Sequence, residues 1–184
     1  MDMQLLNTLA TIGFVLPLFV ALLGMLLARR DYLVAACWGG GVTMALLIAF
    51  GIRGMLRDDP DLPHFPSGHV TLAVAFYGGL LIIWLRGGQA PGRRNLPLVA
   101  LALVAIALVE GWSRVVTTEH TWVDVTGGFI VGTAGLLITG CPWAVRRIQS
   151  GSRLWLAATL AVAAPFAFFN VTWLDGLIRN FVVL

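Results

Sequence analysis

Long apolar runs, separated by short polar stretches, dominate the pattern of this chain. A helix needs about 20 apolar residues to cross the hydrocarbon core of a bilayer, and it satisfies its own backbone groups there. The pattern therefore predicts an all-α fold, an integral membrane bundle of six transmembrane helices in a single domain over residues 1–184. The expected spans are Leu5–Ala28, Tyr32–Ile52, Ser67–Leu85, Leu96–Trp112, Trp122–Thr139 and Leu154–Phe169.

Composition supports this interpretation. The chain is 59% hydrophobic and 11% charged, and its mean hydropathy is +0.89, whereas soluble domains carry about 25% charged residues. The first run is not typical of a signal peptide, because Asp2 rather than a basic residue precedes it and Arg29 follows it. We expect the lipid bilayer as a partner, and nothing in the net charge of +3 indicates nucleic acid.

The basic residues, all twelve of them arginine, predict the orientation. With alternating connections, one face of the membrane receives eight arginines and the other receives four arginines and eight of the nine acids. Positive residues favour the cytoplasmic face. We therefore expect a multi-pass protein of a bacterial inner (cell) membrane. Both termini, and the loops after the second and fourth runs, would lie on the periplasmic or external side.

Two cysteines are present, Cys37 inside the second run and Cys141 after the fifth. This topology places them at different depths, so we expect no disulfide and no metal site.

The start of the third run combines groups that suit an anion. Pro66 fits the first position of a helix, which would leave the amides of Ser67, Gly68 and His69 as unpaired donors at a helix N-terminus. Gly68 permits close approach, the Ser67 hydroxyl adds a donor, and His69 can give a proton near neutral pH. Alternatively, the stretch merely breaks the chain before a membrane helix, with His69 as an interfacial polar residue.

A second polar cluster surrounds the start of the fifth run. His120 and Asp124 share a helix face if the helix has begun by His120, and Asp124 would then orient the imidazole as in a catalytic triad. Arg114 offers a planar fork of donors for phosphate oxygens, and Ser113 adds a hydroxyl or caps local backbone. Glu110 lies one turn before Arg114 and could pair with it as structural support. Alternatively, the cluster is an ion pair at the membrane edge.

These two clusters resemble the type 2 phosphatidic acid phosphatases, a superfamily related to the vanadium haloperoxidases. Residues 66–69 match its Pro-Ser-Gly-His motif. Its third motif, Ser-Arg, five residues, His, three residues, Asp, is matched by Ser113, Arg114, His120 and Asp124. The resemblance implies that His120 is a nucleophile forming a phosphohistidine, that Asp124 orients it, and that no metal or other cofactor is needed. His69 would protonate the leaving oxygen, and the phosphoryl oxygens would be held by Ser67, Gly68 and Arg114.

The family's first motif is degenerate in this chain. It reads Lys, six residues, Arg-Pro, but the chain contains no lysine, and Arg53 and Arg57 are the plausible cationic replacements. Three acids follow, Asp58, Asp59 and Asp61. They are expected in a solvated loop, or alternatively they orient Arg57 or contact a cationic headgroup. His64 is expected to be a loop residue, or alternatively to modulate the pH response.

The resemblance implies a metal-independent lipid phosphate phosphohydrolase at the outer face of the membrane. Its partner would be a phosphorylated membrane lipid: a polyprenyl phosphate or diphosphate such as the undecaprenyl carrier, phosphatidic acid, phosphatidylglycerol phosphate or a lipid A phosphate. Two alternatives stay open, a lipid phosphotransferase using the same phosphohistidine and a non-catalytic lipid-binding or transport protein. The sequence does not predict the oligomeric state.

Overall fold

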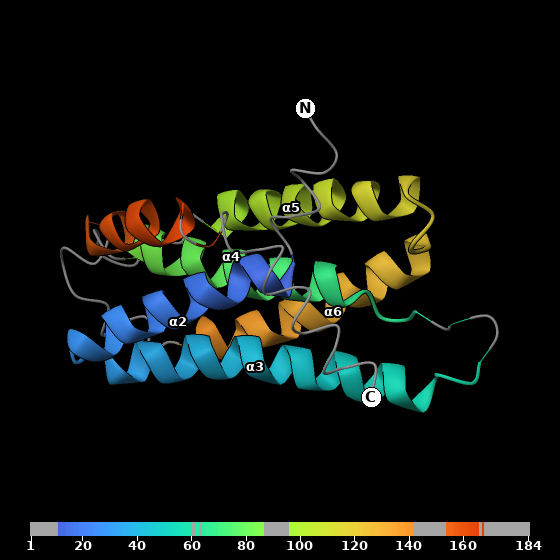
Figure 1. Cartoon of the computed structure of the whole chain (residues 1–184), viewed down its shortest axis with the longest axis horizontal. Coiled ribbons are helices and arrows are strands. Elements are labelled where there is room, and N and C mark those ends of the chain that lie inside the picture. Colours follow the sequence, from blue (N-terminus) through green and yellow to red (C-terminus); the bar gives the residue numbers. More distant parts are fainter. Residues whose placement is uncertain are drawn as a thin grey trace.

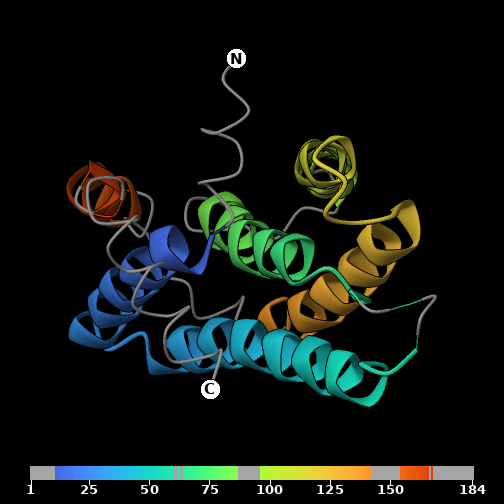
Figure 2. The same cartoon turned by 45° about the vertical axis from the view of Figure 1, so that its right-hand side comes forward.

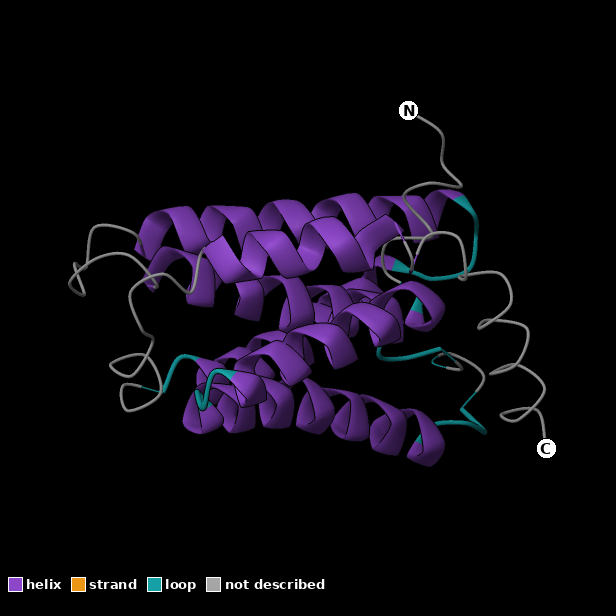
Figure 3. Ribbon diagram, turned by 60° about the vertical axis from the view of Figure 1, so that its left-hand side comes forward, coloured by secondary structure: helices purple, strands orange, loops and turns teal. Residues whose placement is uncertain are grey.

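The structure, a computed structural model, describes residues 11–59, 62, 64–86, 96–141, 154–165 and 167. Within these ranges the regular structure is entirely helical (Figure 3). Its labelled elements are α2 (Ile12–Ala28), α3 (Tyr32–Met55), α4 (Gly68–Arg86), α5 (Leu96–Val116) and α6 (Trp122–Thr139). A shorter apolar helix, Leu154–Pro165, follows.

The helices lie side by side in a bundle, with the α3–α4 and α5–α6 connections at the same end (Figure 1). Four helices are long and apolar enough to cross a membrane: α3, α4, α5 and α6. Gly13–Ala28 and Leu154–Pro165 are shorter, so the described residues support a membrane helical bundle without confirming six crossings.

Helix α4 lies at the centre of the bundle and contributes to both hydrophobic clusters. One cluster joins it to α2, α3 and the C-terminal helix, around Trp38 and Phe76. The other joins it to α5 and α6, around Val74 and Leu136. By contrast, α5 lies at the periphery (Figure 2), and large apolar side chains along it are exposed, as expected for a helix that faces lipid.

Glycines allow α6 to approach its neighbours closely. An added Cβ at Gly135 would lie 2.6 Å from the carbonyl oxygen of Gly41 on α3, and one at Gly132 would lie 2.8 Å from the carbonyl oxygen of Thr71 on α4. Small residues at such crossings let helix backbones pack tightly in membranes. These close glycine contacts form a helix seam that fixes α6 against α3 and α4, the two helices that flank the α3–α4 connection.

Both cysteines are free, and they lie close enough to influence each other electrostatically. Cys37 lies in the second turn of α3 and Cys141 follows the end of α6, at the same end of the bundle. Their different depths stay a prediction.

Candidate active site

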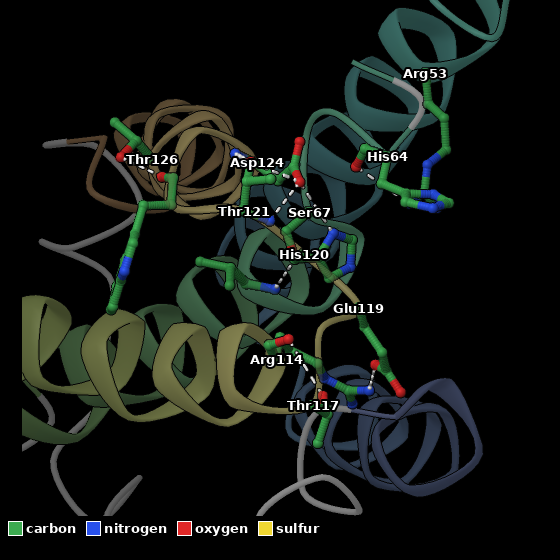
Figure 4. A network of polar contacts seen from close by, with 12 residues as sticks. Arg53, His64, Ser67, Arg114, Thr117, Glu119, His120, Thr121, Asp124 and Thr126 are labelled. Atoms are coloured by element: carbon green, nitrogen blue, oxygen red, sulfur yellow. Dashed lines mark hydrogen bonds and ion pairs between the residues drawn. The ribbon is translucent and has the colours of Figure 1, made fainter. Parts of the chain in front are cut away.

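Four helix ends converge where the two polar clusters lie. Arg53 and Arg114 occupy the last turns of α3 and α5. His69 lies in the first turn of α4, and His120 immediately precedes Thr121, the N-cap of α6. Cations are favoured at helix C-termini and anions at helix N-termini. The arrangement thus directs two cations and two helix N-termini to one region (Figure 4).

Backbone contacts hold the two clusters together. The Ser67 N–H donates to the carbonyl oxygen of Asp124 at 2.9 Å. One turn further along, the Thr71 hydroxyl donates to the carbonyl oxygen of Gly128 at 3.2 Å. At Gly128 an added Cβ would lie 2.6 Å from the Ser67 carbonyl oxygen. The first turns of α4 and α6 therefore pack against each other, which brings segments more than 50 residues apart into one site.

The start of α4 differs from the prediction. The helix begins at Gly68 rather than at Pro66, and the Ser67 amide is used by Asp124. Ser67 is fully buried, and its Oγ lies 3.5 Å from the Val70 N–H, in the position of a helix cap. Its hydroxyl contact with phosphate stays a prediction.

Two donors remain at this helix end. The amides of Gly68 and His69 belong to the first turn, where no carbonyl of the helix itself is available. An added Cβ at Gly68 would meet nothing within 4 Å, so the space beside the Gly68 Cα is open. The helix N-terminus can therefore receive an anion, as expected, although through two amides rather than three.

His120 lies outside helix α6, contrary to the reasoning that paired it with Asp124. Thr121 is the N-cap, and Asp124 reaches back from the third helical position in a capping box. The same atom, Asp124 Oδ2, accepts the Thr121 N–H at 2.8 Å and the Thr121 hydroxyl at 3.0 Å, and lies 3.6 Å from His120 Nδ1. The two side chains are therefore neighbours because of the cap. The last distance is longer than a hydrogen bond, a common feature of sites without substrate.

The environment of His120 favours its neutral form. Burial lowers the pKa of the His120 imidazole below its ordinary value of 6.5. The Asp124 carboxylate acts in the opposite direction. The charges of Arg53, His64 and Arg114 add to the lowering of this pKa. With the Nδ1 proton facing Asp124, a neutral His120 ring carries its free lone pair on Nε2.

Arg114 pairs with Glu119, a residue that the sequence reasoning missed. Helix α5 ends in a Schellman-type turn in which Thr118 has φ of 61° and the Glu119 N–H donates to the Arg114 carbonyl at 3.0 Å. This turn brings the Glu119 carboxylate onto Arg114 Nη1. Residues five apart are not helix neighbours, and Thr118 stands where glycine is usual, so the sequence carried no signal for the pair.

The expected support of Arg114 by Glu110 has a basis in charge, because the two side chains interact electrostatically. Glu110 is buried, and its Oε2 has no hydrogen-bond partner. Its carbonyl oxygen accepts the Ser113 hydroxyl at 2.8 Å. Ser113 is itself fully buried, so it caps local backbone, which is the second of the two roles considered for it.

Arg53 and Arg57, the two candidate cations of the first stretch, separate clearly. Arg53 reaches the site, where its Nη2 donates to the His64 carbonyl at 3.2 Å and its buried Nε has no hydrogen-bond partner. Arg57 is exposed in the turn after α3. Asp58 is exposed beside it, and Asp61 lies outside the described residues. The structure thus brings Arg53, but not Arg57, to the histidines.

Three histidine rings meet between the helix ends. The His69 and His120 centroids are 6.4 Å apart, and those of His64 and His120 are 5.9 Å apart with the rings edge to face. His64, expected to be a plain loop residue, is therefore part of this cluster. Within the described part of the chain, no group of three or more His, Cys, Asp or Glu residues is arranged to hold a metal ion.

The sequence model of the PAP2 superfamily matches residues 54–148, just over half of the chain. A Klebsiella pneumoniae protein described as "Uncharacterized 22.5 kDa protein in cps region" is 29% identical over 143 residues, which cover 73% of this chain and 66% of that protein. No solved structure gives a significant match. The superfamily match contains both clusters of the site, and the resemblance inferred from their spacing is confirmed: the chain belongs to the PAP2 superfamily.

Proposed function

We propose that this protein is an integral membrane lipid-phosphate phosphohydrolase that acts through a phosphohistidine on His120. Membership of the superfamily supports a phosphatase-type activity. The observation that carries the specific proposal is the placement of His120, with Nδ1 facing the Asp124 carboxylate and the ring beside His69.

In the first step, His120 Nε2 attacks phosphorus and the bond from phosphorus to the lipid oxygen breaks. His69 gives its proton to the departing lipid oxygen, which leaves as an alcohol or a lipid phosphate. The lowered pKa of His120 supports this role, because the attacking ring must be neutral. Asp124 then stabilises the positive charge that develops on the ring.

In the second step, water attacks the phosphohistidine and gives its proton to His69. The N–P bond breaks, phosphate leaves, and both histidines return to their starting states. Charge on the transferring oxygens would be held by Arg114, Arg53 and the amides of Gly68 and His69, which all converge on the same region. None of these steps needs a metal ion.

A lipid substrate fits the surroundings of the site. An apolar groove of about 280 Å³ runs between α2, α3 and α4, and its lining includes Phe50 and Leu72. Phe50 lies one turn before Arg53, and Leu72 lies one turn after His69, so the groove begins about 5 Å below the charged groups. A headgroup among the histidines could therefore leave its tail in this groove.

The proposed substrates are those that the resemblance implies, with polyprenyl phosphate or diphosphate first, followed by phosphatidic acid, phosphatidylglycerol phosphate and lipid A phosphates. We further propose that the site faces the periplasmic or external side of a bacterial inner membrane. The distribution of arginines supports that orientation, and the match to a Klebsiella protein is consistent with a bacterial setting.

Phosphate release from a panel of these lipids, in detergent with chelator present, tests the proposal. Wild-type protein is expected to release phosphate and His120→Ala is not, because the nucleophile is absent. Activity that survives His120→Ala, or that needs added metal, would refute the mechanism. Labelled phosphate that appears on a second lipid rather than in solution would indicate a phosphotransferase.

A further inference from the structure

Arg114 and Glu119 form an ion pair whose two members differ in their access to water. Arg114 comes from the last turn of α5, and its side chain is 6% exposed, whereas the Glu119 side chain is 50% exposed. Glu119 is attached to the turn between α5 and α6 rather than to a helix. If the pair opens, the carboxylate can move into solvent at little cost, while the guanidinium stays in place.

The carboxylate occupies a position that a phosphoryl oxygen would need. Arginine donors accept carboxylate and phosphate oxygens in the same geometry, and Glu119 Oε2 lies on Arg114 Nη1. Glu119 also interacts electrostatically with His69 and His120, while its carboxylate is directed at Arg114 (Figure 4).

In the absence of substrate, the opposite charges of Arg114 and Glu119 keep their ion pair formed. Burial raises the pKa of Glu119, but the hydrogen bond and the positive charge of Arg114 outweigh this effect, with smaller contributions from the two histidines. The pKa therefore lies below its usual value. Glu119 is thus an anion at neutral pH and competes with any other anion for Arg114.

We propose that Glu119 is an internal competitor for the phosphoryl site, held on Arg114 at rest, displaced by the phosphoryl group of the substrate, and returned when phosphate leaves. The proposal rests on the proposed function, since it assigns Arg114 to the phosphoryl group. It predicts that phosphate binds more weakly than Arg114 alone would allow, which assists release of the product.

Inorganic phosphate is the probe, with its dissociation constant measured by protection of the detergent-solubilised protein against thermal unfolding. Glu119→Gln removes the charge and keeps the shape, so it should lower the dissociation constant about two- to fivefold, as expected for loss of a half-exposed ion pair. Glu119→Ala should act in the same direction. Asp58→Asn is the matched control, because it removes one negative charge from an exposed turn at the same end of the bundle and should leave the constant unchanged.

A thermodynamic cycle with Arg114→Ala makes the test specific. Arg114→Ala should weaken phosphate binding, and Glu119→Gln should have no further effect in that background. Unchanged or weaker phosphate binding by Glu119→Gln in the presence of Arg114 would overturn the proposal, as would an equal effect with and without Arg114. Absence of phosphate binding by every variant would overturn it as well.

The measurement separates this proposal from the proposed function. Phosphate binding can be measured without turnover. If phosphate competes with Glu119 for Arg114 but the protein hydrolyses no lipid phosphate, the proposed hydrolase function is refuted and the proposed role of Glu119 is not. Conversely, a hydrolase dependent on His120 in which Glu119→Gln binds phosphate no more tightly would refute only the competition.

Discussion

Asp124 Oδ2 faces both the N-cap residue of α6 and His120, and two substitutions can separate the cap from the orienting role that we propose for it. It accepts both donors of Thr121, which caps α6, and it lies 3.6 Å from His120 Nδ1. Thr121→Ala removes the hydroxyl that bonds Oδ2 and the Asp124 N–H, but it keeps the Thr121 backbone N–H on Oδ2. Asp124→Asn keeps an oxygen for the cap and removes the charge that faces His120.

The magnitudes expected for the two variants differ in kind. Loss of the side-chain cap should lower the free energy of unfolding by about 1 kcal/mol in Thr121→Ala, with a change in kcat of less than about threefold. Loss of the orienting charge in Asp124→Asn should lower kcat by about 10²- to 10⁴-fold, or about 3 to 5 kcal/mol of barrier. Its effect on stability should be the smaller of the two, because the amide oxygen still accepts the Thr121 N–H.

Both quantities can be measured on the same detergent-solubilised protein, by release of phosphate from the preferred lipid and by unfolding followed with tryptophan fluorescence. Equal losses of kcat in the two variants would refute the reasoning, because they would show that Asp124 acts on catalysis only by capping α6. Full activity of Asp124→Asn would refute the orienting role outright.

Three further predictions follow from the site and the helix seam. Arg53→Ala should lower kcat/KM about 10- to 100-fold through loss of a partly buried cation at the site. Arg57→Ala, exposed in the next turn, should change kcat/KM less than twofold, and equal effects would contradict this placement. Gly41→Ala should lower the free energy of unfolding by about 1–3 kcal/mol, because its Cβ would lie 2.5 Å from a backbone oxygen of α6, while Gly40→Ala, with nothing within 4 Å, should not destabilise. The acid limb of kcat/KM should have its midpoint below pH 6.5, because the lowered pKa of His120 keeps the nucleophile neutral as pH falls; a midpoint at or above that value would show that another group limits the rate.

The apolar pattern predicted the helices closely, since hydrocarbon allows few other structures. Helix α6 has the expected bounds, α4 begins one residue after the start of the expected span Ser67–Leu85, and α5 continues four residues past Trp112 to Val116. That extension carries Ser113 and Arg114 inside the helix, where polarity alone had suggested a loop. The end of a helix depends on backbone hydrogen bonds, so it is harder to predict from the sequence than the apolar face of the helix.

The proximity of the candidate residues was predictable from the sequence, but the contacts that they make were not. Motif spacing brought His69, His120 and Asp124 together correctly, although the expected reason, a shared helix face, was wrong for His120. Glu119 could not be found, because its contact depends on a turn that reverses the chain after α5. Residue spacing predicts which side chains pair within a helix. Pairs made across a turn depend on the backbone conformation of the turn, which residue spacing does not predict.

The hydrogen bond from the Ser67 amide to the Asp124 carbonyl has a consequence for how this site can diverge. Both partners are backbone groups, so the bond is indifferent to the side chains at either position. The first stretch, by contrast, is tied to the histidines through the Arg53 guanidinium and the His64 carbonyl. Substitutions in the stretch that follows Arg53 can therefore alter the surroundings of His64 while the backbone frame around His69 and His120 keeps its register. A chain without lysine can in this way retain the geometry of its two histidines while the cations beside them change.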